Sequence, residues 1–180
     1  MTKTIQIKKM TIGAGIPKIC VPITGTTEEQ ICKEAEAAKK AGADLVEWRA
    51  DFFEGLLNKQ ACDQVLEELA QILGETPLLF TIRTKEEGGN TSISLEDYRV
   101  CNLNVARSHK ADLIDVEVMG NPEEKKKLIQ ELHQEGANVI ASSHDFDKTD
   151  SKDVLLNRFM EMEKSEADIL KMAVMPHGFE

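Results

Sequence analysis

The 180-residue chain has no long apolar run and a shortage of basic residues. No stretch approaches the roughly 20 apolar residues that a membrane-spanning helix needs, so the sequence predicts no membrane association. Lysine and arginine number 22 against 32 aspartates and glutamates, and the formal net charge is −10. This acidic balance argues against binding to nucleic-acid phosphates. Because the N-terminal residues also lack the apolar core of a signal peptide, we expect a cytoplasmic protein.

The four cysteines form no metal-binding or disulfide motif. Cys20, Cys32, Cys62 and Cys101 are 12, 30 and 39 residues apart, with no CxxC pair. No histidine lies near any of them at the spacing of a zinc site. We expect buried free thiols, because reduced cysteine behaves as a small apolar core residue.

The chain does contain a repeat of apolar runs, each followed by a helical pattern. Six runs begin 25 to 36 residues apart, at residues 18–25, 45–51, 77–84, 113–118, 138–146 and 169–175. This spacing matches a strand, a crossover helix and two loops. Most runs are apolar on both sides of the alternation, which is typical of strands covered on both faces. The sequence therefore predicts six β/α units with a parallel sheet.

Cap signals and a short repeated motif mark the ends of the intervening helices. We expect helices over residues 26–42, 58–73, 94–108, 121–136 and 151–164. Thr26 and Glu29 form a capping-box pattern at the start of the first helix. Four helix-to-strand turns repeat an alanine, an Asp or Asn, and two apolar residues, beginning at positions 43, 111, 137 and 167. This repeat indicates equivalent turns that enter equivalent strands.

Two architectures use an all-parallel sheet, the open doubly wound sheet and the closed barrel. A Rossmann sheet carries a glycine-rich phosphate loop after its first strand. The turn at residues 24–27 reads Thr-Gly-Thr-Thr, with neither GxGxxG nor a Walker A motif. We therefore predict an α/β fold of the (β/α)8 TIM-barrel family. Such barrels usually take roughly 250 residues, so we expect residues 1–180 to form a single, incomplete barrel domain with six of the eight units.

Active sites of these barrels lie at the C-terminal ends of the strands, where polar residues of this chain gather. Lys171 lies within the apolar run 169–175. Burial of an ammonium group costs several kcal/mol unless it is paired or neutralised. One interpretation is an ion pair with Asp115 or Glu117, and the other is an amine that forms a Schiff base with a carbonyl substrate. Asp115 and Glu117 share a strand face but make no convincing metal site.

Other strand ends supply a histidine and two arginines. An imidazole such as that of His144 suits proton transfer near neutral pH, although a lone histidine is as readily structural. Glu47 and Arg49 are two residues apart and share a strand face. With Arg83 they fit either a polar substrate or an internal ion-pair network at the barrel mouth.

Four motifs in this order resemble type I 3-dehydroquinate dehydratase. They are Glu-Trp-Arg-Ala-Asp at 47–51, Phe-Thr-Ile-Arg-Thr at 80–84 with Glu-Gly-Gly at 87–89, Ser-Ser-His-Asp-Phe at 142–146, and Leu-Lys-Met-Ala-Val-Met-Pro at 170–176. The resemblance runs over the whole chain, in the family's order and spacing. It implies a (β/α)8 barrel with an N-terminal β-hairpin, matched by residues 4–12. The segment 1–16 is therefore expected to close the barrel bottom.

The resemblance also implies a reaction. Members of this family convert 3-dehydroquinate to 3-dehydroshikimate and water, the third step of the shikimate pathway to chorismate and the aromatic amino acids. By resemblance, Lys171 forms an imine with the ring ketone. His144 then removes the neighbouring proton and protonates the leaving hydroxyl in a syn elimination, and Glu87 orients His144. No cofactor and no metal are implied, and members are typically cytoplasmic homodimers.

The resemblance extends to substrate binding, with departures. The residues that match the family's substrate-binding positions are Glu47, Arg49 and Arg83, with Trp48 inside the same motif. Pro22 stands where some members have a serine near the substrate. The family continues past its Met-Pro with two more β/α units, which supply an arginine for the substrate carboxylate and a Ser/Gln pair on a lid. We therefore expect turnover by these 180 residues to be much reduced or absent.

Two alternatives to this enzyme remain open. The first is a barrel fragment without catalysis, which persists alone or completes itself with another chain, because an open sheet leaves strand edges unpaired. The second is another Schiff-base lyase or aldolase on the same fold. The His-Asp-Phe and Glu-Trp-Arg motifs argue against the second alternative.

Overall fold

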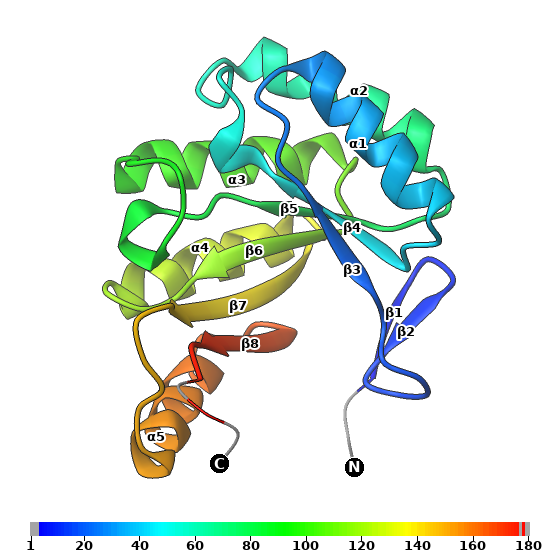
Figure 1. Ribbon diagram of the computed structural model, residues 1–180. Coiled ribbons are helices and arrows are strands. Elements are labelled where there is room, and N and C mark those ends of the chain that lie inside the picture. Colours follow the sequence, from blue (N-terminus) through cyan, green and yellow to red (C-terminus); the bar gives the residue numbers. More distant parts are fainter. Residues whose placement is uncertain (1–3, 177, 179–180) are drawn as a thin grey trace.

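The centre of the molecule is a parallel sheet of six strands. The computed structural model describes residues 4–176 and residue 178 (Figure 1). The strands are β3 (Cys20–Ile23), β4 (Leu45–Arg49), β5 (Leu78–Thr81), β6 (Leu113–Glu117), β7 (Asn138–Asp145) and β8 (Ile169–Val174). They are hydrogen-bonded in chain order, from β3 to β8. A doubly wound sheet reverses its order at a switch point, so this order confirms the barrel-type fold. The six strands form a half-barrel of the TIM-barrel family.

Helices connect the strands and cover the outer side of the curved sheet (Figure 1). They are α1 (Glu28–Lys40), α2 (Lys59–Leu73), α3 (Leu95–Ser108), α4 (Pro122–Gln134) and α5 (Lys152–Glu163), with short 3-10 turns η1 (Ala50–Phe52) and η2 (Lys85–Glu87). All five predicted helices and all six predicted strands are therefore present. Within the described part of the chain, no helix is long and apolar enough to cross a membrane.

Two apolar clusters lie on opposite faces of the sheet. The larger one packs the outward side chains of the strands, such as Val46, Phe80 and Ile114, against the helices. The smaller one consists of Leu45, Leu79, Leu113 and Ile140 from four strands, together with Ile7 and Met10. The last two belong to an antiparallel hairpin of β1 (Ile5–Ile7) and β2 (Met10–Ile12). The predicted N-terminal hairpin therefore packs on the inner face, at the starts of the strands.

The repeated Ala-Asp turn has a structural cause. Asp44 Oδ2 accepts a hydrogen bond from the backbone N–H of Ile19 at 2.8 Å. Asp112 Oδ2 accepts one from Leu78 N–H at the same distance, and Asp168 Oδ2 accepts one from Val139 N–H at 2.9 Å. Each carboxylate thus joins the start of its own strand to the start of the strand before it. The same acceptor therefore serves three strand entries, whereas Asn138 in the fourth copy of the motif donates its side-chain N–H to the carbonyl oxygen of Asp112.

The first helix begins one residue later than predicted. Its N-cap is Thr27, whose side chain accepts from Gln30 N–H at 3.4 Å, and Gln30 Oε1 accepts from Thr26 N–H at 3.0 Å. The turn before the helix is held by Glu34 Oε2, which accepts from the N–H groups of Thr24 and Gly25. The expected Thr26–Glu29 capping box was therefore wrong, because Thr27 and Gln30, each one residue later, make the capping hydrogen bonds.

The prediction of buried thiols holds for one cysteine and fails for another. All four cysteines are free; Cys62 is buried, Cys32 and Cys101 are partly buried, and Cys20 is exposed. Burial raises the pKa of Cys62 to about 12. Cys20 is exposed because β3 has a neighbouring strand on one side only in the described part of the sheet. An edge strand cannot bury every side chain that a central strand would.

Candidate active site

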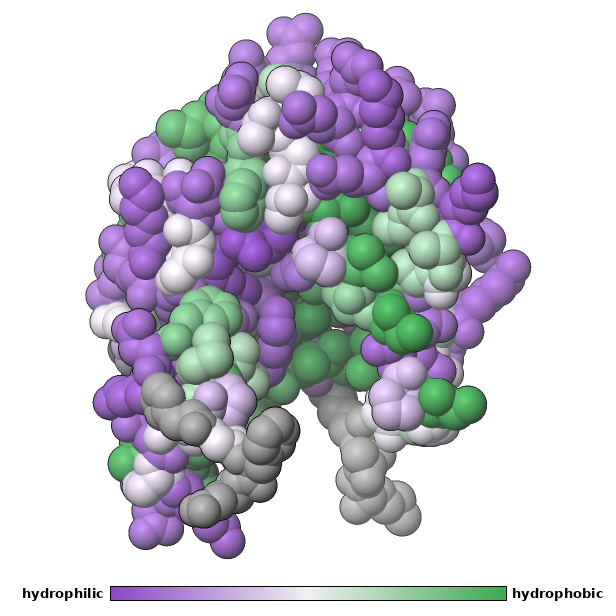
Figure 2. Space-filling view, in the orientation of Figure 1, coloured by the Kyte–Doolittle hydropathy of each residue, from purple (hydrophilic) through white to green (hydrophobic). Residues whose placement is uncertain are grey.

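The inner face of the half-barrel changes from apolar to polar along the strands. Above the apolar layer of Leu45, Leu79, Leu113 and Ile140, the next inward positions are polar on every strand from β4 to β8. They are Glu47, Thr81, Asp115, Ser142 and Lys171. Successive inward positions are two residues apart, because strand side chains alternate between faces. The space-filling view shows a hollow on this side of the molecule (Figure 2). The sequence therefore places its polar inward residues at the carboxyl ends of the strands.

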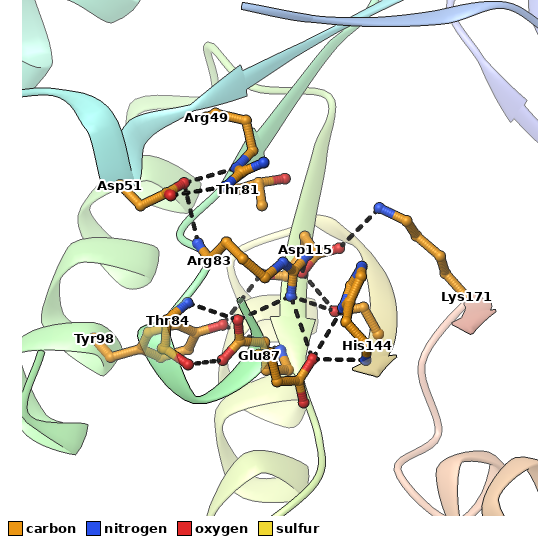
Figure 3. Close-up of polar contacts among 12 residues, drawn as sticks. Arg49, Asp51, Thr81, Arg83, Thr84, Glu87, Tyr98, Asp115, His144 and Lys171 are labelled. Carbon is orange, nitrogen blue, oxygen red and sulfur yellow. Dashed lines mark hydrogen bonds and ion pairs between the residues drawn. The ribbon is translucent and has the colours of Figure 1, made fainter. Parts of the chain in front are cut away.

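Arg83 is the centre of a buried ion cluster in this layer (Figure 3). Its guanidinium donates to Asp115 Oδ1 at 2.8 Å, Glu117 Oε1 at 2.9 Å and Ser142 Oγ at 3.0 Å. Ser142 Oγ in turn donates to Asp115 Oδ1 at 2.7 Å. Burial acts to lower the pKa of Arg83, but the carboxylates of Asp115 and Glu117 overcome it and raise that pKa. Arg83 is therefore a permanently charged group that fixes two strands to each other.

His144 lies beside this cluster and is held by Glu87. Glu87 Oε2 lies 2.9 Å from His144 Nδ1 and also accepts from the backbone N–H of His144 at 3.0 Å. When Nδ1 donates its proton to this carboxylate, Nε2 is left as the free basic nitrogen. Both side chains are largely buried, with 5% and 10% exposed. The pair thus has the arrangement of an oriented general base.

A short loop brings Glu87 to the histidine and depends on two glycines. Glu117 accepts from Thr84 N–H at 2.8 Å and from Thr84 Oγ1 at 2.7 Å, which anchors the start of the loop. Gly88 has φ +77°, and a Cβ there would lie 2.5 Å from the Phe146 ring. A Cβ on Gly89 would lie 2.0 Å from the carbonyl oxygen of Arg83. The Glu-Gly-Gly motif therefore allows the loop to pack directly against β5 and Phe146.

Lys171 extends from β8 toward the cluster and forms no hydrogen bond with it. Its Nζ lies 3.9 Å from Glu47 Oε1 and 3.9 Å from Asp115 Oδ2, too far for hydrogen bonds. Asp115 Oδ2 is buried and has no hydrogen-bond partner among the described residues. The side chain of Lys171 is 38% exposed, so the expectation of a buried lysine was wrong, because β8 is an edge strand here. The ion-pair interpretation holds for Asp115 but not for Glu117, which pairs with Arg83.

Arg49 is partly occupied by its own motif. Its Nε and Nη2 donate to the two oxygens of Asp51, each at 2.8 Å. Asp51 also accepts from the backbone N–H groups of Arg83 and Asn90. The guanidinium lies 5.1 Å from the ring centre of Phe52. The end of β4 is thus fixed to the residues that follow β5, and Arg49 Nη1 has no hydrogen-bond partner among the described residues.

The half-barrel thus brings an amine, an oriented histidine and a buried ion cluster together at the carboxyl ends of its strands. The chain also matches a known family. A family model for type I 3-dehydroquinase matches residues 19–180.

The chain belongs to the type I 3-dehydroquinase family.

Similar proteins show how much of a family member these residues represent. The 3-dehydroquinate dehydratase of Clostridium botulinum is 42% identical over 176 residues, which are 98% of this chain and 69% of that protein. Among solved structures, the type I 3-dehydroquinate dehydratase of Clostridium difficile with covalent modified comenic acid has a TM-score of 0.95 and 41% identity, covering 99% of this chain and 71% of that one. The Enterococcus faecalis structure has a TM-score of 0.91 and 37% identity, with 97% and 72% covered. The chain thus spans about seven-tenths of the length of these relatives.

More distant structures share the fold alone. A putative deoxyribose-phosphate aldolase from Toxoplasma gondii has a TM-score of 0.65 at 13% identity. At this identity the similarity supports the barrel architecture and carries no argument about an aldolase reaction.

The 3-dehydroquinase motifs come together at one place, with one exception. Lys171, His144, Glu87 and Arg83 border the same polar layer (Figure 3), and Glu47 joins it 3.9 Å from the Lys171 amine.

Trp48 lies on the other face of β4 and is 0% exposed. Its ring packs against Phe80 at 5.4 Å and Phe53 at 5.9 Å between ring centres. We therefore assign Trp48 to the core, because strand alternation points it away from its motif neighbours Glu47 and Arg49.

Several residues of this polar layer had no predicted catalytic or binding role. Asp115 and Glu117 were predicted only as partners of the lysine or as a weak metal site, and Thr84 and Ser142 only as members of their motifs. A usable signal was present, because Asp115 and Glu117 occupy consecutive inward positions of a strand whose other residues are apolar. Within the described residues, no group of three His, Cys, Asp or Glu side chains is arranged to hold a metal ion.

Proposed function

We propose that the chain carries the chemistry of 3-dehydroquinate dehydration, by a Schiff-base syn elimination that yields 3-dehydroshikimate and water. One observation carries the proposal. The amine of Lys171 lies 3.9 Å from the carboxylates of Glu47 and Asp115, with no hydrogen bond to the described residues, and on the neighbouring strand β7 Glu87 orients His144. This is the equipment for imine formation followed by proton abstraction.

In the proposed first stage, the Lys171 nitrogen attacks the ring ketone, and loss of water leaves a protonated imine. The positive charge forms within reach of Glu47 and Asp115, both 3.9 Å from Nζ in the free protein. Opposite charges at such a distance attract by several kcal/mol where water is partly excluded. These carboxylates therefore favour the charged imine over the free ketone.

In the second stage, His144 acts as base and then as acid. Its Nε2 takes the proton from the carbon next to the imine, and the electron pair moves to the imine nitrogen to give an enamine. The same imidazole then protonates the leaving hydroxyl, which departs as water as the enamine returns its electrons. Hydrolysis of the imine releases the product and the amine. Glu87 holds the imidazole throughout, because its carboxylate accepts from the other ring nitrogen.

Substrate hydroxyls are assigned to three side chains. Glu47 is free to accept on the side away from Thr81, whose Oγ1 donates to it at 2.7 Å. Arg49 keeps Nη1 available after its two bonds to Asp51. Arg83 lies beneath the site. Its positive charge acts on the substrate across the carboxylates of Asp115 and Glu117, which it binds. We also assign the chain to the shikimate pathway on the strength of its family.

The experiment traps the imine. The purified chain is incubated with 3-dehydroquinate and sodium borohydride, and the peptide that carries the adduct is identified by mass spectrometry. We expect one reduced adduct on Lys171, none in Lys171→Met, and an adduct with reduced dehydration in His144→Ala. Absence of an adduct from the unmodified chain, under conditions in which a full-length relative is labelled, would refute retained imine chemistry.

A second candidate function is a barrel fragment that completes itself with another copy. The observation that favours it is the open sheet, in which β3 and β8 each have one paired neighbour. Helix α5 also exposes Leu156, Phe159 and Met160 to solvent in the described part of the chain. Light scattering after size exclusion separates the cases. A 20.0 kDa monomer would exclude self-completion, and a compact dimer would support it.

A further inference from the structure

A pair of thiols lies outside the polar layer, where the fold brings two helices together. Cys62 belongs to α2 and Cys101 to α3, and the two residues are 39 positions apart in the sequence. The two helices pack against each other on the outer side of the sheet (Figure 1). Because the spacing along the chain indicates no pairing, only the folded structure places these two side chains together.

Both thiols donate to one backbone oxygen. Cys62 Sγ donates to the carbonyl oxygen of Leu56 at 3.2 Å and lies 3.6 Å from that of Gly55. Cys101 Sγ donates to the same oxygen of Leu56 at 3.7 Å. Two donors that share one acceptor atom lie close together. Rotation of the two side chains and a small shift of the helices therefore bring the sulfurs to the separation of about 2 Å that a disulfide needs.

A small cavity gives both thiols room to move and an opening to solvent. It has a volume of about 110 Å³, and Cys62, Cys101 and Leu56 border it. Leu57 and Val100 also border it and are 67% and 41% exposed. A side chain in a close-packed core has no space to change its rotamer. These thiols have such space, and a small reagent can reach it from the surface between the two exposed side chains.

The surroundings of the pair favour an uncharged product. Burial raises the pKa of Cys62 to about 12, and the neighbouring Cys101 adds to that rise. Burial also raises the pKa of Cys101. A metal ion would require both thiols to be ionised, whereas a disulfide carries no charge. The less basic thiolate of a reagent such as glutathione is also the better leaving group in thiol–disulfide exchange.

We propose that Cys62 and Cys101 are a redox modification site, which a small disulfide such as oxidised glutathione converts to a disulfide bond between α2 and α3. Cys101 reacts first, because it is only partly buried, whereas Cys62 is 8% exposed. The inference does not rest on the proposed dehydration, since neither thiol belongs to the polar layer of the sheet.

The modification is two successive exchange steps. The thiolate of Cys101 attacks one sulfur of oxidised glutathione, the S–S bond of the reagent breaks, and one glutathione leaves as its thiolate. The thiolate of Cys62 then attacks the Cys101 sulfur of the mixed disulfide, and the second glutathione leaves. The two cysteines lose two electrons in total, one glutathione disulfide gains them, and the two thiol protons are taken up by the two released glutathione thiolates.

Peptide mapping tests the site. The reduced chain is incubated with oxidised glutathione, its remaining thiols are blocked in denaturant at low pH, and the single-chain band of a non-reducing gel is digested with trypsin. Digestion leaves Cys62 in peptide 60–83 and Cys101 in peptide 100–107. We expect these two peptides to be joined and to separate on reduction. The Tm of the oxidised chain should rise by roughly 5–10 °C, because the cross-link restricts the unfolded chain.

Variants and an unfolded sample decide the outcome. Cys62→Ala and Cys101→Ala should each abolish the joined peptides, and Cys32→Ala, the matched control on α1, should form them as the unmodified chain does. Two variants of the pair are used so that a folding defect in one, seen by circular dichroism, does not decide the result. In urea the same reagent should give mixed disulfides with glutathione and fewer joined peptides. No joined peptides from the folded chain while the unfolded chain reacts, or an equal yield from both, would overturn the proposal.

Discussion

Replacement of Arg83 by methionine is the most direct test of the ion cluster. The change keeps most of the apolar length of the side chain and removes its charge. Asp115 and Glu117 are then left without their bonds of 2.8 and 2.9 Å to the guanidinium, and Ser142 loses a donor at 3.0 Å. Both carboxylates remain buried, at 0% and 4% exposed residue surface. The variant therefore leaves buried Glu117 without its counter-charge and leaves Asp115 with only the more distant Lys171, at 3.9 Å.

The expected cost at pH 7 is large for a single substitution. Removal of one partner from a buried ion pair typically costs about 3–5 kcal/mol, because the remaining charge stays desolvated. Bonds to charged groups contribute about 1.5–3 kcal/mol each, but they are not additive within one cluster. We therefore expect the free energy of unfolding of Arg83→Met to fall by about 3–5 kcal/mol.

The loss should depend on pH in one direction. The pKa of Glu117 is already raised in the folded protein by burial, and it should rise further without Arg83. A carboxyl group with a raised folded pKa stabilises the fold at pH values below its unfolded pKa, and loses that contribution as the pH rises through the folded pKa. The difference between Arg83→Met and the unmodified chain should therefore be largest near neutral pH and shrink toward pH 4.

Urea denaturation followed by fluorescence measures these values, because the chain has a single tryptophan and it is buried in the core. Arg107→Met is the matched control. Arg107 pairs with Glu135 at 2.9 Å, but their side chains are 57% and 33% exposed, so its loss should cost less than about 1 kcal/mol. Equal losses for the two variants, or a loss from Arg83→Met that does not change with pH, would refute the argument.

Three further predictions concern the loop and the thiols. Glu87→Gln should slow the residual turnover of the chain by about 10- to 100-fold, measured by absorbance of the conjugated product, because a neutral amide supports the imidazole base less well; a rate equal to that of the unmodified chain would contradict the assigned role. Gly89→Ala should lower the free energy of unfolding by about 2 kcal/mol or more, since its Cβ would lie 2.0 Å from the carbonyl oxygen of Arg83. Iodoacetamide followed by mass spectrometry should label Cys20 well before Cys62, because the pKa of each thiol is raised to about 12 but only Cys20 is exposed to the reagent; equal rates would contradict that difference in exposure.

Local patterns were sufficient to predict the arrangement of strands and helices. Alternation, helical spacing and cap residues act over a few positions, and they located all six strands and all five helices of the half-barrel. The repeated turn was also correctly interpreted as a repeated strand entry, because its three aspartate copies make the same hydrogen bond; in the fourth copy, Asn138 instead donates to the carbonyl oxygen of Asp112. The first cap was predicted one residue early, because Thr26 and Thr27 are both suitable N-cap residues and each has a Glu or Gln three residues later.

By itself, the sequence determined the β/α repeat, the motifs that resemble type I 3-dehydroquinase, and the strand ends on which their polar residues lie. The tertiary structure decided which of those residues meet. It joined Glu87 to His144 and Arg83 to Asp115 and Glu117, across separations of 32 to 57 residues. It also directed Trp48 into the core and left Lys171 partly exposed. Such outcomes depend on strand register, on which face a side chain takes, and on which strands have neighbours, and these are properties of the assembled sheet.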